Sequence, residues 1–213
     1  MPVPAVPWWA RASSLLAPVL LIGGWTVAAA IQPGGFDSAQ GTISALAGLA
    51  ATDRWVMTLA IAGTGACHLV TASGLRPAAR PGRVLLALGG AATLLVAAFP
   101  LPSAEGGSTP HGISAFVAFL ALSLWPLAAW QRGAAVPWGL RPAVSVAAGA
   151  VLLVLLAAFG VALAAGGGIG LTERLAAGAQ AVWPALVVAS CRSVRAGDDL
   201  GSRRPARDRE EST

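Results

Sequence analysis

The chain has 213 residues, of which 56% are hydrophobic and only 11% are charged, and its mean hydropathy is +0.71. These values exclude an ordinary water-soluble domain, because so much apolar surface has to be solvated by lipid. The formal net charge is +5, but the arginines form short clusters between apolar runs and do not follow one face. We therefore expect the lipid bilayer as a partner, and no nucleic acid.

Six apolar stretches are long enough to cross a bilayer core, which needs roughly 20 residues per helix. The predicted spans are 14–31, 55–75, 84–99, 111–130, 143–165 and 171–191. They predict an all-α, polytopic membrane protein, with a six-helix transmembrane domain over residues 13–195 and an N-terminal segment over 1–12. The apolar run of the first span is longer than the core of a secretory signal, so we expect this helix to be retained and not cleaved.

The arginines predict the orientation of the spans. Twelve of the fourteen fall on the side of the two termini, and Arg54 and Arg174 fall on the other side. Because cytoplasmic connections carry the excess of basic residues, both termini are predicted to be cytoplasmic. The chain has no lysine, tyrosine or asparagine and is rich in alanine and glycine. This bias fits a GC-rich bacterial genome, and so we expect a multi-pass protein of the bacterial plasma membrane.

The first predicted outer connection, residues 32–54, carries a helix signal. Asp37 and Gln40 have the spacing of a capping box, and apolar residues recur at i, i+3, i+4 and i+7 from Ile43 to Ala50. This pattern predicts a short helix on the outer membrane interface.

Several polar residues lie in or beside the predicted outer connections: Asp37, Ser44, Glu105, His111, Glu173 and Arg174. A histidine near carboxylates and a serine can supply acid/base or metal chemistry. However, the chain contains no HExxH or GxSxG motif, and one outer histidine would need carboxylates from separate loops to hold zinc. We therefore expect no catalytic residue, metal or cofactor; helix capping and ion pairing are the alternative to a ligand pocket.

Two of the predicted helices continue this polar set into the membrane. Glu173, Gln180 and Trp183 are spaced by 7 and 3 residues and share a helix face, and His111 and Ser114 are similarly aligned. Polar side chains at this depth should face the bundle, since an unpaired group in lipid costs a few kcal/mol. They either hold the helices together or line a ligand cavity.

His68 is the one ionisable side chain predicted inside a span, with Glu173 and Arg174 placed beside the outer connections. An intramembrane ionisable residue suggests a proton-coupled or ligand-binding role. The alternative is a neutral histidine that is hydrogen-bonded to a neighbouring helix, since no carboxylate is predicted within the membrane to partner it. His68 lies about 20 Å along its helix from the outer surface, too far to share a metal with His111.

Five segments of the chain resemble a known bacterial membrane family, domain of unknown function 998: FDSAQGTISALAG, DRWVM, AAFPLP, TPHGISAF and GLTERLAAGAQAVWPAL. The resemblance covers about residues 10–195. It implies six helices and characteristic positions at Asp37 with Ser44, Phe99-Pro100, His111, and Glu173-Arg174 with Trp183. More remotely, the Ile-Ser pair and the helix-opening histidine are similar to the Frag1/DRAM/Sfk1 group, some members of which handle lipids.

The sequence therefore favours a non-catalytic membrane protein that binds a lipid, another small ligand or a partner protein in an outward-facing polar pocket. The predicted pocket residues are Asp37, Ser44, Glu105, His111, Ser114, Glu173, Arg174, Gln180 and Trp183. A small-molecule or ion transporter is the first alternative, and it requires a continuous polar path past His68 to the cytoplasm. A membrane-embedded lipid hydrolase is the second, and it requires a bound metal or a serine within reach of His111.

Residues 196–213 are polar and of mixed charge, with no apolar face to bury. They predict a disordered cytoplasmic tail. The sequence makes no prediction about the oligomeric state.

Overall fold

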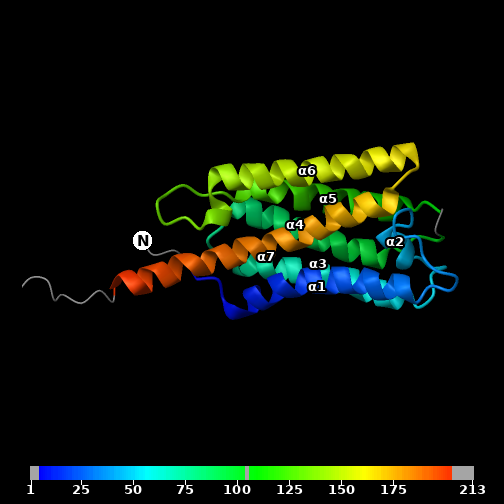
Figure 1. The fold of residues 1–213 in the computed structure, drawn as a ribbon, viewed down its shortest axis with the longest axis horizontal. Helices are drawn as coiled ribbons and strands as arrows, with labels where there is room; N and C mark the ends of the chain where they lie inside the picture. Colours follow the sequence, from blue (N-terminus) through cyan, green and yellow to red (C-terminus); the bar gives the residue numbers. More distant parts are fainter. Residues whose placement is uncertain (1–4, 104–105, 203–213) are drawn as a thin grey trace, which may run out of the picture.

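The computed structural model describes residues 5–103 and 106–202, with side chains through Cys191. Over this part the chain is built of helices and turns without strands, which confirms the all-α class (Figure 1). The elements are α1 (Trp8–Ala30), α2 (Ile43–Leu46), α3 (Trp55–Gly74), α4 (Arg80–Ala98), α5 (Thr109–Ala129), the short 3-10 helix η1 (Trp138–Leu140), α6 (Pro142–Ala165) and α7 (Ile169–Ser202).

The described residues contain six helices that are long and apolar enough to cross a membrane, which confirms the six predicted spans. Two helices begin four or more residues earlier than the hydropathy predicts: α1 begins at Trp8 and α4 at Arg80. In α4 the proline in the first turn has no N–H to satisfy, so the helix accommodates it there. Hydropathy finds the apolar centre of such a helix and misses its polar first turn.

The last helix is longer than predicted. Its apolar part ends at Cys191, but the helix continues to Ser202, into the segment predicted to be a disordered tail. Once a helix is formed, each further residue adds a backbone hydrogen bond, and polar residues can therefore extend it. The rest of the predicted tail, 203–213, lies outside the described residues.

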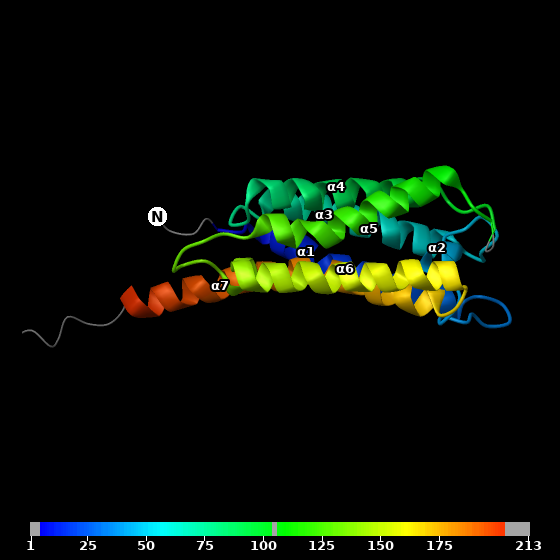
Figure 2. The same ribbon diagram turned by 90° about the horizontal axis from the view of Figure 1, so that it is seen from above.

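The six long helices form a closed ring. Each one packs against the next in the chain, and α7 packs against α1. The helix α1 begins and α7 ends at the same end of the bundle, which we call the termini end; α2 lies at the opposite end, the α2 end (Figures 1 and 2). Short connections between neighbouring antiparallel helices produce this order.

Small residues allow α3 and α4 to approach closely. A Cβ on Gly65 would lie 2.7 Å from the carbonyl oxygen of Gly90, and a Cβ on Gly90 would lie 2.8 Å from that of Gly65. Lipid tails are as apolar as the helix side chains, so the hydrophobic effect does not drive helices together within a membrane. Close backbone contact of this kind stabilises their association through van der Waals packing instead.

The helix α6 is the most lipid-exposed of the six. Only 17% of its apolar window is buried, and Val151, Val154 and Val161 are each more than half exposed. Among the long helices, it packs mainly against α5 and α7. As a result, grooves run along both sides of α6.

The short helix predicted in the first connection is present as α2, but its cap is different. The hydroxyl of Thr42 accepts the N–H of Ala45 at 2.9 Å. Asp37, which was predicted to cap a helix, instead accepts the N–H of Ala39 at 2.8 Å in a separate turn. This turn closes on itself, because the N–H of Gly41 bonds the carbonyl of Asp37.

Candidate functional site

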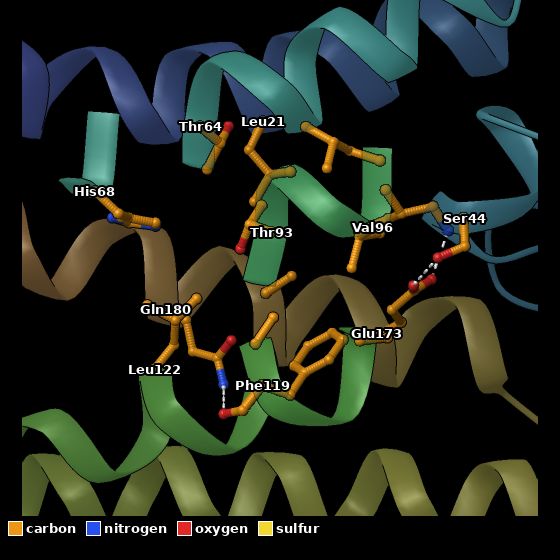
Figure 3. A pocket seen from close by; sticks show the side chains of 15 residues that line it. Leu21, Ser44, Thr64, His68, Thr93, Val96, Phe119, Leu122, Glu173 and Gln180 are labelled. Carbon is orange, nitrogen blue, oxygen red and sulfur yellow. Dashed lines mark hydrogen bonds between the residues drawn. The ribbon is translucent and has the colours of Figure 1, made fainter. Parts of the chain in front are cut away.

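Glu173 lies inside the protein at the α2 end. Its side chain is 4% exposed, although it belongs to the first turns of α7. The carboxyl accepts a hydrogen bond from the backbone N–H of Ile43, and a second from the hydroxyl of Ser44 at 3.3 Å (Figure 3). Both donors belong to α2, whose first N–H groups have no partner within the helix. The carboxyl therefore joins the last long helix to the first connection.

The neighbouring Arg174 bonds a different part of the same connection. Its Nη1 donates to the carbonyl oxygens of Ser38 and Gly41, each at 2.8 Å, and to that of Gly170 at 2.9 Å. Its guanidinium lies 5.8 Å from the centre of the Phe36 ring. Arg174 thus fixes the connection and borders neither of the two cavities described below.

Backbone contacts reinforce this junction. The N–H of Leu171 donates to the carbonyl of Ala39 at 3.0 Å, and the N–H of Gly168 donates to the side chain of Gln40 at 2.9 Å. A Cβ on Gly170 would overlap the carbonyl oxygen of Gly41. Residues 37–44 and the start of α7 therefore form one packed unit, which holds Ser44 and Glu173 in place.

An inner cavity of about 70 Å³ lies within the ring, bordered by α1, α2, α3, α4, α5 and α7. Six of its lining residues are polar and the others are apolar. The polar ones are Ser44, Thr64, His68, Thr93, Glu173 and Gln180. In Figure 3, Ser44 and Glu173 lie at one end of the cavity and His68 at the other.

Gln180 faces the bundle, as the sequence predicts for a polar residue at this depth. It is 2% exposed, and its amide nitrogen donates to the carbonyl of Phe119 and to the hydroxyl of Ser123, both at 2.9 Å. The amide oxygen lies on the other side of the group and accepts no hydrogen bond from a described residue. Gln180 thus connects α7 to α5, and its amide oxygen remains available as a hydrogen-bond acceptor beside the cavity.

His68 is 1% exposed and its side chain makes no hydrogen bond within the described part of the chain. Its Nδ1 is buried without a partner. The structure therefore does not show the interhelical hydrogen bond that a purely structural histidine would make. Further toward the termini end, a cluster of buried apolar side chains includes Leu75, Leu86 and Trp125. The buried hydroxyls of Ser13 and Thr71 also lie in this half of the bundle and bond one another at 2.9 Å.

A second, larger cavity of about 450 Å³ forms a groove between α5 and α6, which we call the outer groove. Its walls are mainly apolar, and the rings of Phe119 and Phe159 meet there with their centres 5.3 Å apart. Its polar lining residues are Thr42, Ser44, His111 and Glu173. Ser44, Ala115, Phe119 and Glu173 border both cavities. Glu173 therefore lies at the boundary between the inner cavity and the outer groove.

His111 is 6% exposed and lines the outer groove, but its ring is engaged with the backbone. Its Nδ1 lies 2.8 Å from the carbonyl oxygen of Phe99. The hydroxyl of Ser114 donates to the carbonyl of Pro110, and that of Ser44 donates to Glu173. The described residues thus contain no serine–histidine hydrogen bond of the kind that activates a nucleophile. They also contain no group of three or more His, Cys, Asp or Glu side chains that could hold a metal ion.

The structure brings five of the predicted pocket and intramembrane residues to the two cavities: Ser44, His68, His111, Glu173 and Gln180. Asp37 is exposed in its turn, and Ser114 and Arg174 line neither cavity. Trp183 packs edge-on against Trp138, with ring centres 6.2 Å apart, in an apolar recess between α6 and α7. Glu105 lies outside the described residues.

The sequence predictions missed the threonines of the cavities and the aromatic walls of the outer groove. Thr64 could have been found, because it precedes His68 by four residues and so shares its helix face. Nothing comparable in the sequence predicts that a cavity is lined by Thr42, Thr93 and Phe159. Their position beside a cavity depends on how separate helices pack together.

One protein-family model matches residues 15–190, and its description reads "Protein of unknown function (DUF998)". Neither a curated protein nor a solved structure gives a significant match. The remote similarity to the Frag1/DRAM/Sfk1 group is not shown by these comparisons.

Proposed function

Because the chain belongs to the DUF998 family of proteins of unknown function, whose membership assigns no reaction, we propose a role from the site itself. In this proposal the protein is a multi-pass membrane protein that binds a single lipid in the outer groove, without chemical turnover. With the α2 end outside, as the arginine distribution predicts, we infer that the lipid comes from the outer leaflet of a bacterial plasma membrane.

The amphipathic lining of the outer groove carries this proposal. Aromatic and aliphatic walls between α5 and α6 suit an acyl chain, and the buried carboxyl of Glu173 with the hydroxyl of Ser44 suits a headgroup. The volume of about 450 Å³ falls within the usual range for small-molecule sites, about 300–1,000 Å³.

The polar end of the groove sets the chemistry of the ligand. A lipid tail gains little by moving from the bilayer into an apolar groove, since both environments are equally apolar. Selectivity must therefore come from the headgroup. A carboxylate offers about four acceptor positions, and Ile43 and Ser44 use two of those of Glu173. The favoured headgroup is one that donates hydrogen bonds, either an amine or a hydroxyl.

Native mass spectrometry of the protein released from detergent tests the proposal. The blocking variant is Gly160→Leu: Gly160 lines the groove, and a Cβ there meets no atom within 4 Å. The matched control is Gly23→Leu on α1, where a Cβ also has open space and which lines neither cavity.

The proposal expects the wild type and Gly23→Leu to retain one lipid per chain, and Gly160→Leu to lose most of it. If the wild type retained no lipid, or if all three proteins retained the same amount, binding in this groove would be refuted.

A further inference from the structure

The inner cavity meets the outer groove at Glu173, but its other end lies deeper in the bundle, at His68. It is bordered by two buried ionisable side chains, Glu173 at the α2 end and His68 about 20 Å along α3 from its first residue. Among the residues that line it, these two are the titratable ones. The other helices contribute uncharged side chains to the lining, among them Leu21 from α1, Thr93 from α4 and Leu122 from α5.

We propose that the inner cavity holds a chain of water molecules that links the Glu173 carboxyl to the His68 imidazole and acts as a proton relay into the bundle. This role does not depend on lipid binding in the outer groove. Two observations carry it: the cavity that joins the two groups, and the buried imidazole that has no protein partner.

The size of the cavity fits a short water chain. One water needs about 10–15 Å³ of this kind of volume, so 70 Å³ accommodates about five. Five waters at hydrogen-bond spacing of about 2.8 Å, with one further bond at each end, span about 17 Å. Glu173 and Gln180 are separated by two helical turns, about 10 Å along α7. The chain can therefore pass Gln180 and extend about 7 Å beyond it, toward His68 at the other end of the same cavity.

The polar lining gives these waters partners along the way. A purely apolar cavity stays dry, whereas a water is stable where it finds about three hydrogen bonds. Thr64 and Thr93 donate their hydroxyls to carbonyls of their own helices, at 2.8 Å in each case, so their oxygens can still accept. The amide oxygen of Gln180 accepts as well. Acceptors thus occur between the two ends of the cavity.

Proton transfer along this chain of waters conserves atoms and charge and needs no further reactant. A proton enters at the Glu173 carboxylate, each water takes a proton on one side and gives one up on the other, and the unprotonated ring nitrogen of His68 accepts the last. The imidazole becomes imidazolium, and release runs in reverse. Only O–H and N–H bonds form and break.

Hydrogen exchange of the imidazole N–H, followed by solid-state NMR in lipid bilayers, tests the relay. The chain has two histidines, so ¹⁵N-histidine labelling gives two ring N–H signals, one from each neutral imidazole, and His68→Gln identifies them. After transfer into D₂O, the relay predicts that the His68 N–H signal is lost within minutes. A signal that persists for hours would mean that His68 is dry and would overturn the proposal.

A blocking variant tests the route. Ala177 lines the cavity midway between Glu173 and Gln180, and Ala177→Leu should slow exchange at His68 at least tenfold. The matched control is Ala179→Leu on the same helix, which faces the recess between α6 and α7 and should leave the rate unchanged. If Ala177→Leu does not fold, Ala118→Leu blocks the cavity from α5. Unchanged exchange in the blocked protein would show that water does not enter past Glu173, which refutes the relay.

The outer-groove variant Gly160→Leu separates the two proposals. It should remove most of the retained lipid and leave exchange at His68 as fast as in the wild type. Slower exchange at His68 in this variant would count against a separate inner path.

Discussion

The carboxyl of Glu173 accepts the backbone N–H of Ile43, which lies 130 residues earlier in the chain. This hydrogen bond connects the last long helix with the short helix of the first connection. Because Ser44 donates to the same carboxyl, one side chain of α7 organises the polar end of both cavities.

Removing this carboxyl should destabilise the protein. Glu173→Ala leaves the N–H of Ile43 buried without an acceptor, and an unsatisfied buried donor costs about 1–3 kcal/mol. Glu173→Gln keeps an acceptor oxygen and should lose less than half as much. Unfolding free energies in detergent micelles measure both values. Equal losses in the two variants would show that the hydrogen bond to α2 contributes nothing.

Gly170→Ala should loosen the junction between α7 and residues 37–44. The added Cβ would overlap the carbonyl oxygen of Gly41, and such overpacking costs about 1–3 kcal/mol. Limited proteolysis should then cut the first connection faster than in the wild type. Gly23→Ala, where a Cβ meets no atom within 4 Å, is the control and should leave cleavage unchanged. Equal cleavage rates in Gly170→Ala and the control would contradict the packed junction.

Gln180 and Ser123 should be energetically coupled. Their side chains are 2.9 Å apart, and interhelical hydrogen bonds in membranes contribute about 0.6 kcal/mol on average. A double-mutant cycle with Gln180→Ala and Ser123→Ala should give a coupling of about this size. The pair Gln180→Ala and Ser145→Ala should be additive, because Ser145 bonds the carbonyl of Gly139 elsewhere in the bundle. A coupling of zero in the first cycle would show that the bond has no net effect.

The spans could be predicted because their cause is local. A helix that crosses a bilayer must carry about 20 consecutive apolar residues, and such a run can be recognised directly in the amino-acid sequence. The prediction also placed Gln180 toward the bundle, since a polar amide in lipid would lack partners. Helix ends were less accurate, because polar first turns such as that of α4 do not register in hydropathy.

The burial of Glu173 could not be predicted, because it depends on how a distant segment folds over it. Hydropathy places a glutamate near the end of a span in the polar interface. Here the backbone N–H of Ile43 and the hydroxyl of Ser44, both in α2, provide the hydrogen bonds that make burial possible. That the membrane holds no carboxylate to accompany His68 stays a prediction, although Glu173 and His68 line the same cavity.

The face shared by Glu173, Gln180 and Trp183 shows the limit of spacing arguments. Seven residues return almost to the same direction on a helix, but three residues fall about 60° short of a turn. That angle is enough to move Trp183 from the inner cavity into the recess beside Trp138. Residues on one face of a helix do not have to line one cavity, because different parts of that face can pack against different neighbouring helices.

Photo-crosslinking from the outer groove tests lipid binding most directly. Benzoylphenylalanine in place of Phe159 lies in the groove, and the same residue in place of Val161, which is 68% exposed, samples surrounding lipid. We predict that position 159 captures one lipid class with an amine or hydroxyl headgroup, and that Glu173→Gln reduces this capture severalfold without affecting position 161. Capture of the same lipid mixture at both positions, unchanged by Glu173→Gln, would contradict the proposed lipid site.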